Sequence, residues 1–528
     1  MQLHKSYGIN GQPILGTYVA QDIEAMKAVH DVGMNMIIGG KTDLDSTTET
    51  GRFCKEHGIG IQYHMTHHLY GKPRLREFID DRQTVIPVRM AGNAKMRHVP
   101  DTGTVQIEDE LITYRERDDH ELRGCVRGAN GTKPASHREG IILFWPDECR
   151  REVEEVKYLP NLCGYYVLDD SPGDANSALR AMYSVIREVD SDVVNRPVVA
   201  GFGSLGSLVN FSPGVCDIVM FYWYPVSDMG YDRLMTSTHT QWALTHMRKQ
   251  VPGIPFLGVY QAFDGGSVGS GQGKPTKKQL REQLEDFVRE GASGLVAFLC
   301  SHKNMDGFAE NEYMKEVIGE VHREILETGG CTVAPEPEEM RRARIQPQGF
   351  WEVPPNEVPG IVPAWNVIGP FDAAGKNIDV HVPPDDVINL DATYDGKHGR
   401  IRWITRRTFG GVLGISELHG AHTETIDSVT YAQCRVTSPE EQRVQIRYCS
   451  DDDAILRLNG KTIHRFDGGR GVTFDADVFE VVLPKGESTI DVKVHNRAGM
   501  HGLFLRFTDL TGAPLSGLTF SPDGAAKA

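Results

Sequence analysis

Residues 14–40, ILGTYVAQDIEAMKAVHDVGMNMIIGG, contain a predicted strand, helix and second strand in succession. Short apolar runs open and close the stretch, as expected of two buried strands. Between them Ile23, Met26 and Val29 recur at helical spacing, and Gly33 follows as a helix stop signal. Apolar strands joined by an amphipathic helix are typical of a parallel sheet that helices cover on both faces.

The same pattern continues to about residue 330. A closed barrel fits this span better than an open doubly wound sheet, because eight such units occur and no GxGxxG follows the first strand. The fold predicted for residues 1–330 is therefore an α/β (β/α)8 TIM barrel. Its further strands are predicted at residues 60–65, 163–170, 196–203, 216–225, 254–263 and 295–300.

A long insertion separates the third strand from the fourth. Within residues 70–145 or so, TVIPVRM (84–90), TVQIEDELITYRE (104–116) and IILFWP (141–146) resemble strands, with turn signals between them. We expect a small β-subdomain that projects from the loop after the third strand. Loops at that end of barrel strands lie on the catalytic face, so the subdomain is expected to form one wall of the site.

The pattern changes after residue 330. Residues 331–362 are rich in proline and predict a stiff linker. Residues 363–528 contain short alternating strands with Asn-Gly and Lys-Gly turns, which predict an all-β sandwich of the jelly-roll type. Its strands are predicted at residues 365–371, 401–407, 429–436, 443–449, 454–460, 478–486, 488–497 and 503–509.

Length and charge limit the function classes. A chain of 528 residues is too long for one hydrophobic core, which agrees with two large domains. The net charge is −16 and no Lys/Arg cluster occurs, so we expect no nucleic-acid partner. No apolar run is long enough to span a membrane, so we expect no membrane partner. The oligomeric state stays open, and a homodimer is one of the alternatives.

The first residues, MQLHKSYGING, lack the apolar core of a signal peptide. The protein is therefore expected to be cytoplasmic, or to be secreted or periplasmic with its signal removed. The second of these is favoured.

The strongest functional signal is GYYVLDDSP, residues 164–172. It places Asp169 and Asp170 where a buried strand meets its loop, and the carboxyl ends of the strands build the active sites of such barrels. Burial and mutual repulsion can raise the pKa of one of two adjacent acids enough for it to act as a general acid. The alternative is that one of them caps the next helix or pairs with an arginine.

This segment, with the following IREVDSD and RPVV, resembles the fourth-strand region of glycoside-hydrolase-like barrels, which commonly contain YY-x-x-DEP. The resemblance covers the whole barrel in pattern, but only this segment and GASGLVAF (291–298) are motif-like. It implies a glycosidase that cleaves O-glycosidic bonds of an oligo- or polysaccharide. It also implies that Asp170 is the general acid/base and that Asp169 contacts a sugar hydroxyl.

The sequence departs from that family at the seventh strand, where VYQAFDGG (259–266) has Gln261 in place of a nucleophilic glutamate. An amide cannot act as a carboxylate nucleophile, so Asp264 or Asp228 is the candidate for the second acid. Three alternatives stay open: an inverting pair of aspartates, a sugar-assisted reaction, and a barrel that has lost catalysis.

Aromatic residues at the strand ends are candidates for stacking against sugar rings, and nearby polar side chains are candidates for contacting hydroxyl groups. Because strand side chains alternate between two faces, packing in the core is the alternative for each aromatic residue. The residues expected to contact substrate are Tyr18, His64, Tyr166, Tyr222, Trp223, Tyr224, Gln261 and His302.

Two metal sites were weighed. His64, His67 and His68 lie close together in YHMTHH, but zinc sites usually draw a ligand from elsewhere in the chain. These histidines are therefore expected to contact sugar or solvent, and a metal-dependent hydrolase is the less favoured alternative. Neither a catalytic metal nor a cofactor is expected. A structural calcium ion could bind the acidic run 451–453, since Ca²⁺ favours clustered oxygen ligands.

The second domain contains WNVIGPFD, SDDDAILRLNGKTIHR and VKVHNRAGMHGLFLRF, and it resembles the galactose-binding-like sandwich often appended to sugar-active enzymes. That resemblance implies a supporting or glycan-binding role. The predicted function is thus a glycosidase with a carbohydrate substrate, and the alternative is a non-catalytic glycan-binding protein on a barrel scaffold.

Overall fold

The computed structural model describes most of the chain. The residues that it leaves undescribed are 1–7, 10, 19, 21, 91–95, 170–173, 204–205, 223, 228–229, 232, 266–272, 302–305, 336–358, 409–410, 420–421, 473–474, 523–525 and 528. Four predicted site residues, Asp170, Trp223, Asp228 and His302, lie outside the described residues.

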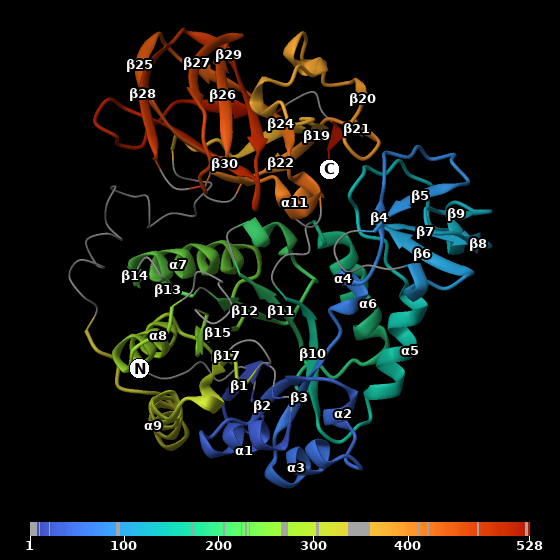
Figure 1. The fold of residues 1–528 in the computed structure, drawn as a ribbon, viewed down its shortest axis with the longest axis vertical. Helices are drawn as coiled ribbons and strands as arrows, with labels where there is room; N and C mark the ends of the chain where they lie inside the picture. Colours follow the sequence, from blue (N-terminus) through green and yellow to red (C-terminus); the bar gives the residue numbers. More distant parts are fainter. Residues whose placement is uncertain are drawn as a thin grey trace.

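Eight parallel strands close into a barrel (Figure 1). Each strand pairs with its neighbour in the sequence, and the last pairs with the first, as in Ile14 beside Gly294. This confirms the predicted (β/α)8 barrel. The strands are β1 (Ile14–Tyr18), β2 (Met36–Gly39), β3 (Gly60–His64), β10 (Leu162–Leu168), β11 (Val198–Phe202), β12 (Ile218–Tyr222), β15 (Phe256–Gln261) and β17 (Gly294–Phe298).

Helices surround the barrel (Figure 1). Local signals fix their ends: the Asp22 side chain accepts the Ala25 N–H at 2.9 Å at the start of α1, and α3 ends at Gly58 with φ of 68°. In the described part of the chain, no helix has the length and apolar character needed to cross a membrane. The helices are α1 (Ile23–Asp31), α2 (Lys41–Leu44), α3 (Glu49–His57), α4 (His67–Tyr70), α5 (Pro146–Val156), α6 (Asn176–Val189), α7 (Arg233–Gln250), α8 (Lys277–Arg289) and α9 (Glu312–Thr328).

Side chains of the barrel strands point alternately outward and inward, so that one apolar cluster lies outside the barrel and another inside it. Leu15, Ile37 and Val167 point outward and pack with the helices. Met36, Val259 and Val296 belong to a smaller cluster that fills the barrel. Because side chains alternate between the two faces, the second cluster also contains Tyr18, Tyr166 and Tyr222.

The insertion after β3 is a β-subdomain with its own apolar core, as the sequence predicts. The prediction of a strand at residues 141–146 was wrong, since Ile142 and Phe144 make only isolated bridges, to Arg74 and Gln106. Pro146 then begins α5, where the missing N–H of proline costs no hydrogen bond. The strands are β4 (Arg74–Leu75), β5 (Ile86–Arg89), β6 (Gly103–Ile107), β7 (Glu110–Tyr114), β8 (Glu116–Arg117) and β9 (Glu121–Arg123).

The second half forms two facing sheets that are antiparallel except for the β22–β32 pair, which confirms the predicted β-sandwich. Cys434 and Val492 of one sheet share an apolar core with Ile446 and Leu505 of the other. The larger sheet contains β19 (Ala364–Asp372), β22 (Ile404–Arg407), β24 (Ser428–Ser438), β26 (Asp453–Leu458), β27 (Lys461–Phe466), β29 (Gly486–Asn496), β31 (Thr519–Ser521) and β32 (Ala526–Lys527). The smaller contains β23 (Val412–Gly414), β25 (Gln442–Asp451), β28 (Asp477–Leu483) and β30 (Gly502–Thr508).

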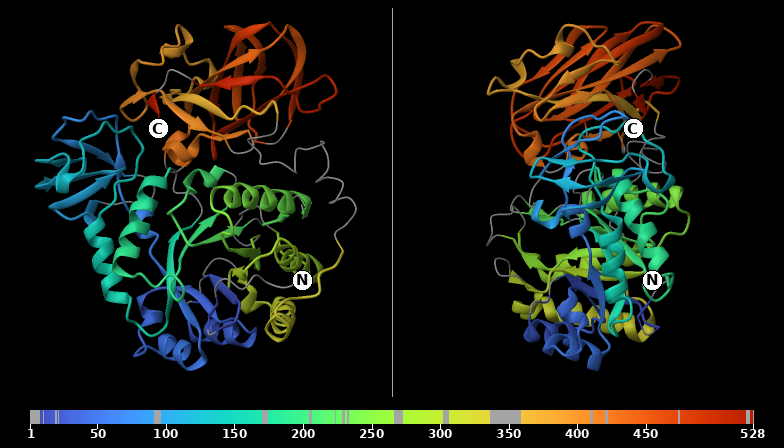
Figure 2. Two further views of the ribbon diagram at one scale, coloured as in Figure 1. Left: turned by 180° about the vertical axis from the view of Figure 1, so that it is seen from behind. Right: turned by 90° about the vertical axis from the view of Figure 1, so that its right-hand side faces the viewer.

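Barrel, insertion and sandwich lie next to one another (Figure 2). Largely buried ion pairs connect them. Asp174, just before α6, forms ion pairs with Arg138 of the insertion and with Arg406 of β22, the latter at 2.9 Å. Arg89 of β5 pairs with Glu424 and donates to the carbonyl oxygen of His419 at 2.6 Å. These contacts connect the sandwich to the side of the barrel from which β10 and its loop emerge.

Candidate active site at the barrel mouth

Three side chains from β1 and β10 form a hydrogen-bonded chain at the carboxyl end of the barrel. The Tyr166 hydroxyl donates to Oδ1 of Asp169 at 2.8 Å, and the Tyr18 hydroxyl lies 2.7 Å from the Tyr166 hydroxyl. Because Tyr166 uses its proton on the carboxylate, Tyr18 must donate to Tyr166. Tyr166 is fully buried, whereas Asp169 is only half-buried. The chain therefore supports one carboxyl group from below.

The environment of Asp169 disfavours its charged form. Burial raises the pKa of Asp169, and hydrogen bonds from Tyr166 and Tyr222 only partly oppose that effect. Among the described residues, no charged group contributes to this shift. Asp169 therefore keeps its proton to a higher pH than an exposed aspartate does, and in that form it can donate a hydrogen bond to a ligand.

Aromatic rings form a wall beside Asp169. Tyr224 stacks on Tyr222 with ring centroids 5.8 Å apart, and on Phe298 at 5.3 Å. Phe298 in turn meets Tyr18 edge to face at 5.2 Å. Tyr224 and Phe298 are half-buried. Partly exposed aromatic rings of this kind are suited to contact with the apolar surface of a pyranose.

His64 ends β3 on the same rim. Its ring centroid is 5.8 Å from that of Tyr166, and its Nε2 lies 3.1 Å from Oγ1 of Thr66. Solvent reaches the ring, yet surrounding protein atoms lower the pKa of His64 by desolvation. The imidazole is consequently neutral near pH 7 and can both donate and accept hydrogen bonds.

Two other predicted residues have different surroundings. The Gln261 side chain is fully buried; its Nε2 donates to the carbonyl oxygens of Val226 and Gly273 at 3.1 and 2.8 Å, and its Oε1 accepts the Val226 N–H at 3.0 Å. It therefore holds two loops together, and its contact with substrate stays a prediction.

Asp264 lies on β16 (Phe263–Asp264), which pairs with β18 (Asp306–Gly307). Burial and the charge of Asp264 raise the pKa of Tyr313 on α9, so this carboxylate is close to α9. Its role as second catalytic acid, like that of Asp228, stays a prediction.

The sequence analysis missed Phe298 and Phe263. Phe263 meets Tyr224 edge to face at 5.2 Å, and Phe298 ends the eighth strand. The rule that strand ends build the site could have found Phe298, because GASGLVAF ends on it. Glu152, which lies next to His67 and His68, was also not predicted, and His64 does not belong to this group.

The acidic run of the sandwich is held by protein donors. The carboxylate of Asp452 accepts the backbone N–H groups of Arg470 and Arg497, at 2.9 and 2.7 Å. Asp453 forms ion pairs with His495 at 2.8 Å and Arg497 at 2.6 Å. These contacts already occupy oxygens that calcium would need, and the structural calcium ion stays a prediction.

No family model matches the chain, and no curated protein matches it. Solved structures similar to it include a GH2 beta-galacturonidase from Eisenbergiella tayi, with 14% identity and a TM-score of 0.35 over 61% of this chain and 53% of that one. A beta-galactosidase from Rahnella sp. R3 aligns over 94% of this chain and 100% of that one, with 10% identity and a TM-score of 0.40. Pyruvate kinase of Cryptosporidium parvum aligns over 61% and 75%, with 13% identity and a TM-score of 0.31.

The chain spans about half the length of the Eisenbergiella tayi enzyme. At identities of 10–14% the activities of these proteins do not transfer to this chain. The strand pairing of this chain establishes the fold.

Proposed function

We propose that the protein is a glycoside hydrolase that cleaves O-glycosidic bonds of an oligo- or polysaccharide at the barrel mouth. The observation that carries the proposal is the Asp169 carboxyl group, which two tyrosines hold beside half-buried aromatic rings. Glycoside hydrolysis uses a pair of carboxyl groups, and aromatic rings beside them can position the sugar ring.

In this proposal Asp170 is the general acid/base, and Asp169 binds the sugar hydroxyl next to the scissile bond. The raised pKa of Asp169 supports its part in this division, because a protonated Asp169 can donate a hydrogen bond to the sugar. Asp264 or Asp228 supplies the second carboxylate. Tyr224 and Phe298 stack on the sugar, and His64 contacts a hydroxyl group.

The experiment is a screen for reducing-end release from neutral and acidic oligo- and polysaccharides. The wild-type protein, Asp170→Asn and Asp169→Asn are compared with Asp31→Asn, which changes an exposed aspartate at the end of α1. We expect turnover by the wild type and the control and at least a hundredfold loss in Asp170→Asn. Full activity of Asp170→Asn would remove it from the mechanism.

The second candidate function is glycan binding without catalysis, and a groove on the sandwich favours it. The groove encloses about 840 Å³ over β24, β26 and β29, and its lining includes Gln433, Arg457 and Asp491. Burial raises the pKa of Asp491 to about 6, and among the described residues no donor contacts its carboxylate. Buried polar groups of this kind are available to hydroxyl groups of a ligand.

A glycan array separates the two candidates. If binding is lost in Asp491→Ala but not in Asp169→Asn, and no sugar is released by the wild type, the binding function is supported. If release depends on Asp170, catalysis at the barrel mouth is supported.

A further inference from the structure

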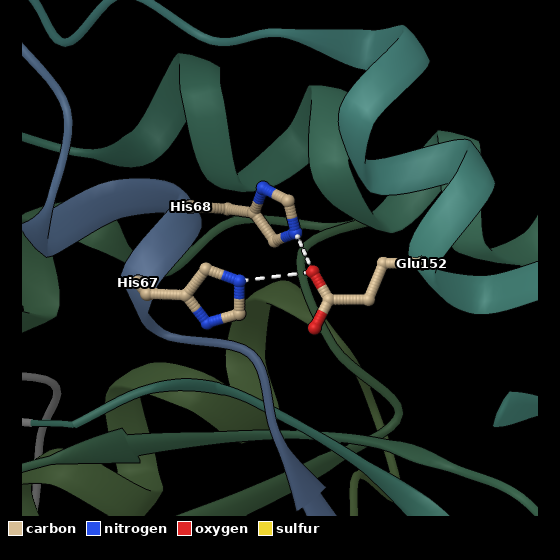
Figure 3. A group of neighbouring side chains, drawn as sticks. All are labelled: His67, His68 and Glu152. Carbon is tan, nitrogen blue, oxygen red and sulfur yellow. Dashed lines mark hydrogen bonds and ion pairs between the residues drawn. The ribbon is translucent and has the colours of Figure 1, made fainter. Parts of the chain in front are cut away.

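A second cluster of titratable side chains lies outside the barrel mouth (Figure 3). His67 and His68 come from α4, directly after β3, and Glu152 comes from α5. Nε2 of His67 and Nε2 of His68 each lie 2.9 Å from the same oxygen, Oε2 of Glu152. Two adjacent imidazoles thus converge on one carboxylate oxygen. Glu152, which supplies this oxygen, follows His68 by 84 residues in the sequence.

The three ligand atoms have the spacing of a metal site. All three atoms lie within 4.8 Å of one another. Among the described residues, this is the one group of three or more His, Cys, Asp or Glu side chains with such spacing. Zinc bonds of about 2.0–2.2 Å to histidine nitrogen and carboxylate oxygen place neighbouring ligand atoms slightly more than 3 Å apart. The observed 2.9 Å contacts would therefore need to open by only a few tenths of an ångström.

The carboxylate is supported from its other side. The Tyr63 hydroxyl, on β3, donates to Oε1 of Glu152 at 2.5 Å and leaves Oε2 directed at the histidines. A hydrogen bond of this type fixes the orientation of metal-binding carboxylates. His68 lacks the matching support, since its Nδ1 has no partner in the described part of the chain. We therefore expect weaker binding than at a site in which every ligand has such support.

The site is also accessible. A cavity of about 480 Å³ adjoins it, and His67 is half exposed. The nearest lysines do not leave an excess of positive charge, because Lys72 pairs with Glu148 and Lys41 pairs with Glu155. An ion can enter through this cavity, and water can fill coordination positions that the protein leaves open.

We propose that His67, His68 and Glu152 bind one divalent transition-metal ion of the zinc type, with water completing its coordination. The ion joins α4 to α5, where the insertion leaves the barrel and returns to it. Closing so long a loop at its base stabilises the insertion. The site is separate from the proposed glycosidase chemistry and does not depend on it.

The alternative to a metal site is a pair of hydrogen bonds from neutral histidines to Glu152. Metal titration distinguishes a metal site from this hydrogen-bonded pair. Untagged full-length protein is freed of metal with a chelator and titrated with Zn²⁺ against a chromophoric indicator. The variants are His67→Ala and Glu152→Gln, and the control is His57→Ala, which removes an exposed histidine of α3. Circular dichroism of the metal-free proteins checks that each variant is folded.

We expect one equivalent of Zn²⁺ to bind to the wild type and to His57→Ala, with an affinity at least about tenfold lower in both site variants. Zinc should raise the melting temperature of the wild type and leave that of Glu152→Gln unchanged. Co²⁺ should give visible absorption bands that the site variants lack. Equal affinity of the wild type and both site variants, or no stoichiometric zinc on the wild type, would overturn the proposal.

Discussion

At the residue scale, the account depends on one carboxyl group. Asp169 is half-buried at the end of β10, and its partners are tyrosine hydroxyls, which cannot neutralise a negative charge. An arginine in their place would have lowered the pKa and made Asp169 a structural ion pair. The surroundings thus favour a proton-holding role over a purely structural one.

The raised pKa of Asp169 makes a prediction for stability. Between the ordinary aspartate pKa of about 3.9 and the higher folded value, the native state binds more protons than the unfolded state, so stability falls as pH rises through that window. Asp169→Asn removes this penalty and can still accept the Tyr166 hydrogen bond. Asp169→Asn should therefore be more stable relative to wild type at pH 7 than at pH 3.5. Urea denaturation at the two pH values measures this difference in the free energy of unfolding. An equal difference at both pH values would contradict the burial argument.

At the scale of elements, Glu110 holds the insertion together. Its side chain is 1% exposed, pairs with Arg127 at 2.7 Å and His137 at 2.8 Å, and accepts the N–H groups of Gly128 and Ala135. These contacts outweigh burial and lower the pKa of Glu110 to about 2. One carboxylate therefore connects β7 with the loop that leads back to the barrel.

Glu110→Gln should destabilise the insertion by about 3–5 kcal/mol near pH 7, because it leaves the buried Arg127 guanidinium without its counter-charge. The lowered pKa contributes stability above about pH 4.5 and loses it as pH falls towards 2, so the difference from wild type should shrink in acid. Thermal melts at pH 7 and pH 3 measure it. Glu121→Gln, which alters a more exposed pair with Arg123, should cost no more than about 1 kcal/mol. Equal effects of the two variants would refute this role.

The elements also show what the sequence could and could not predict. Tyr18, Tyr166, Asp169 and Tyr222 were found because strand ends of a barrel share one rim, whatever their separation in the chain. Glu152 could not be found, because its pairing with His68 depends on how α5 packs beside β3. The buried bracing role of Gln261 likewise depends on two loops that only the folded chain brings together.

At the scale of the whole molecule, Asp174 couples the three parts. It lies before α6 and receives Arg138 from the insertion and Arg406 from the sandwich, all three being largely buried. Either arginine would be left without its counter-charge if the carboxylate were removed. The junction should therefore make the barrel and the sandwich unfold together.

Asp174→Ala should cost about 3–5 kcal/mol and split the thermal transition in two, as the sandwich melts apart from the barrel. Differential scanning calorimetry measures both effects. The control is Asp192→Ala, at the far end of α6, where a more exposed pair with Arg196 is worth about 1 kcal/mol or less. A single unshifted transition in Asp174→Ala would show that the junction does not couple the domains.

In the proposed reaction, the barrel mouth supplies a proton to the leaving oxygen of a glycosidic bond. The most direct measurement is kcat/KM of wild type and Asp170→Asn on aryl glycosides whose leaving groups differ in pKa. A missing general acid matters most for poor leaving groups, so the loss should grow from little for dinitrophenol to about 10²–10⁴-fold for unsubstituted phenol. A loss that is the same for every leaving group, or no loss at all, would contradict the account.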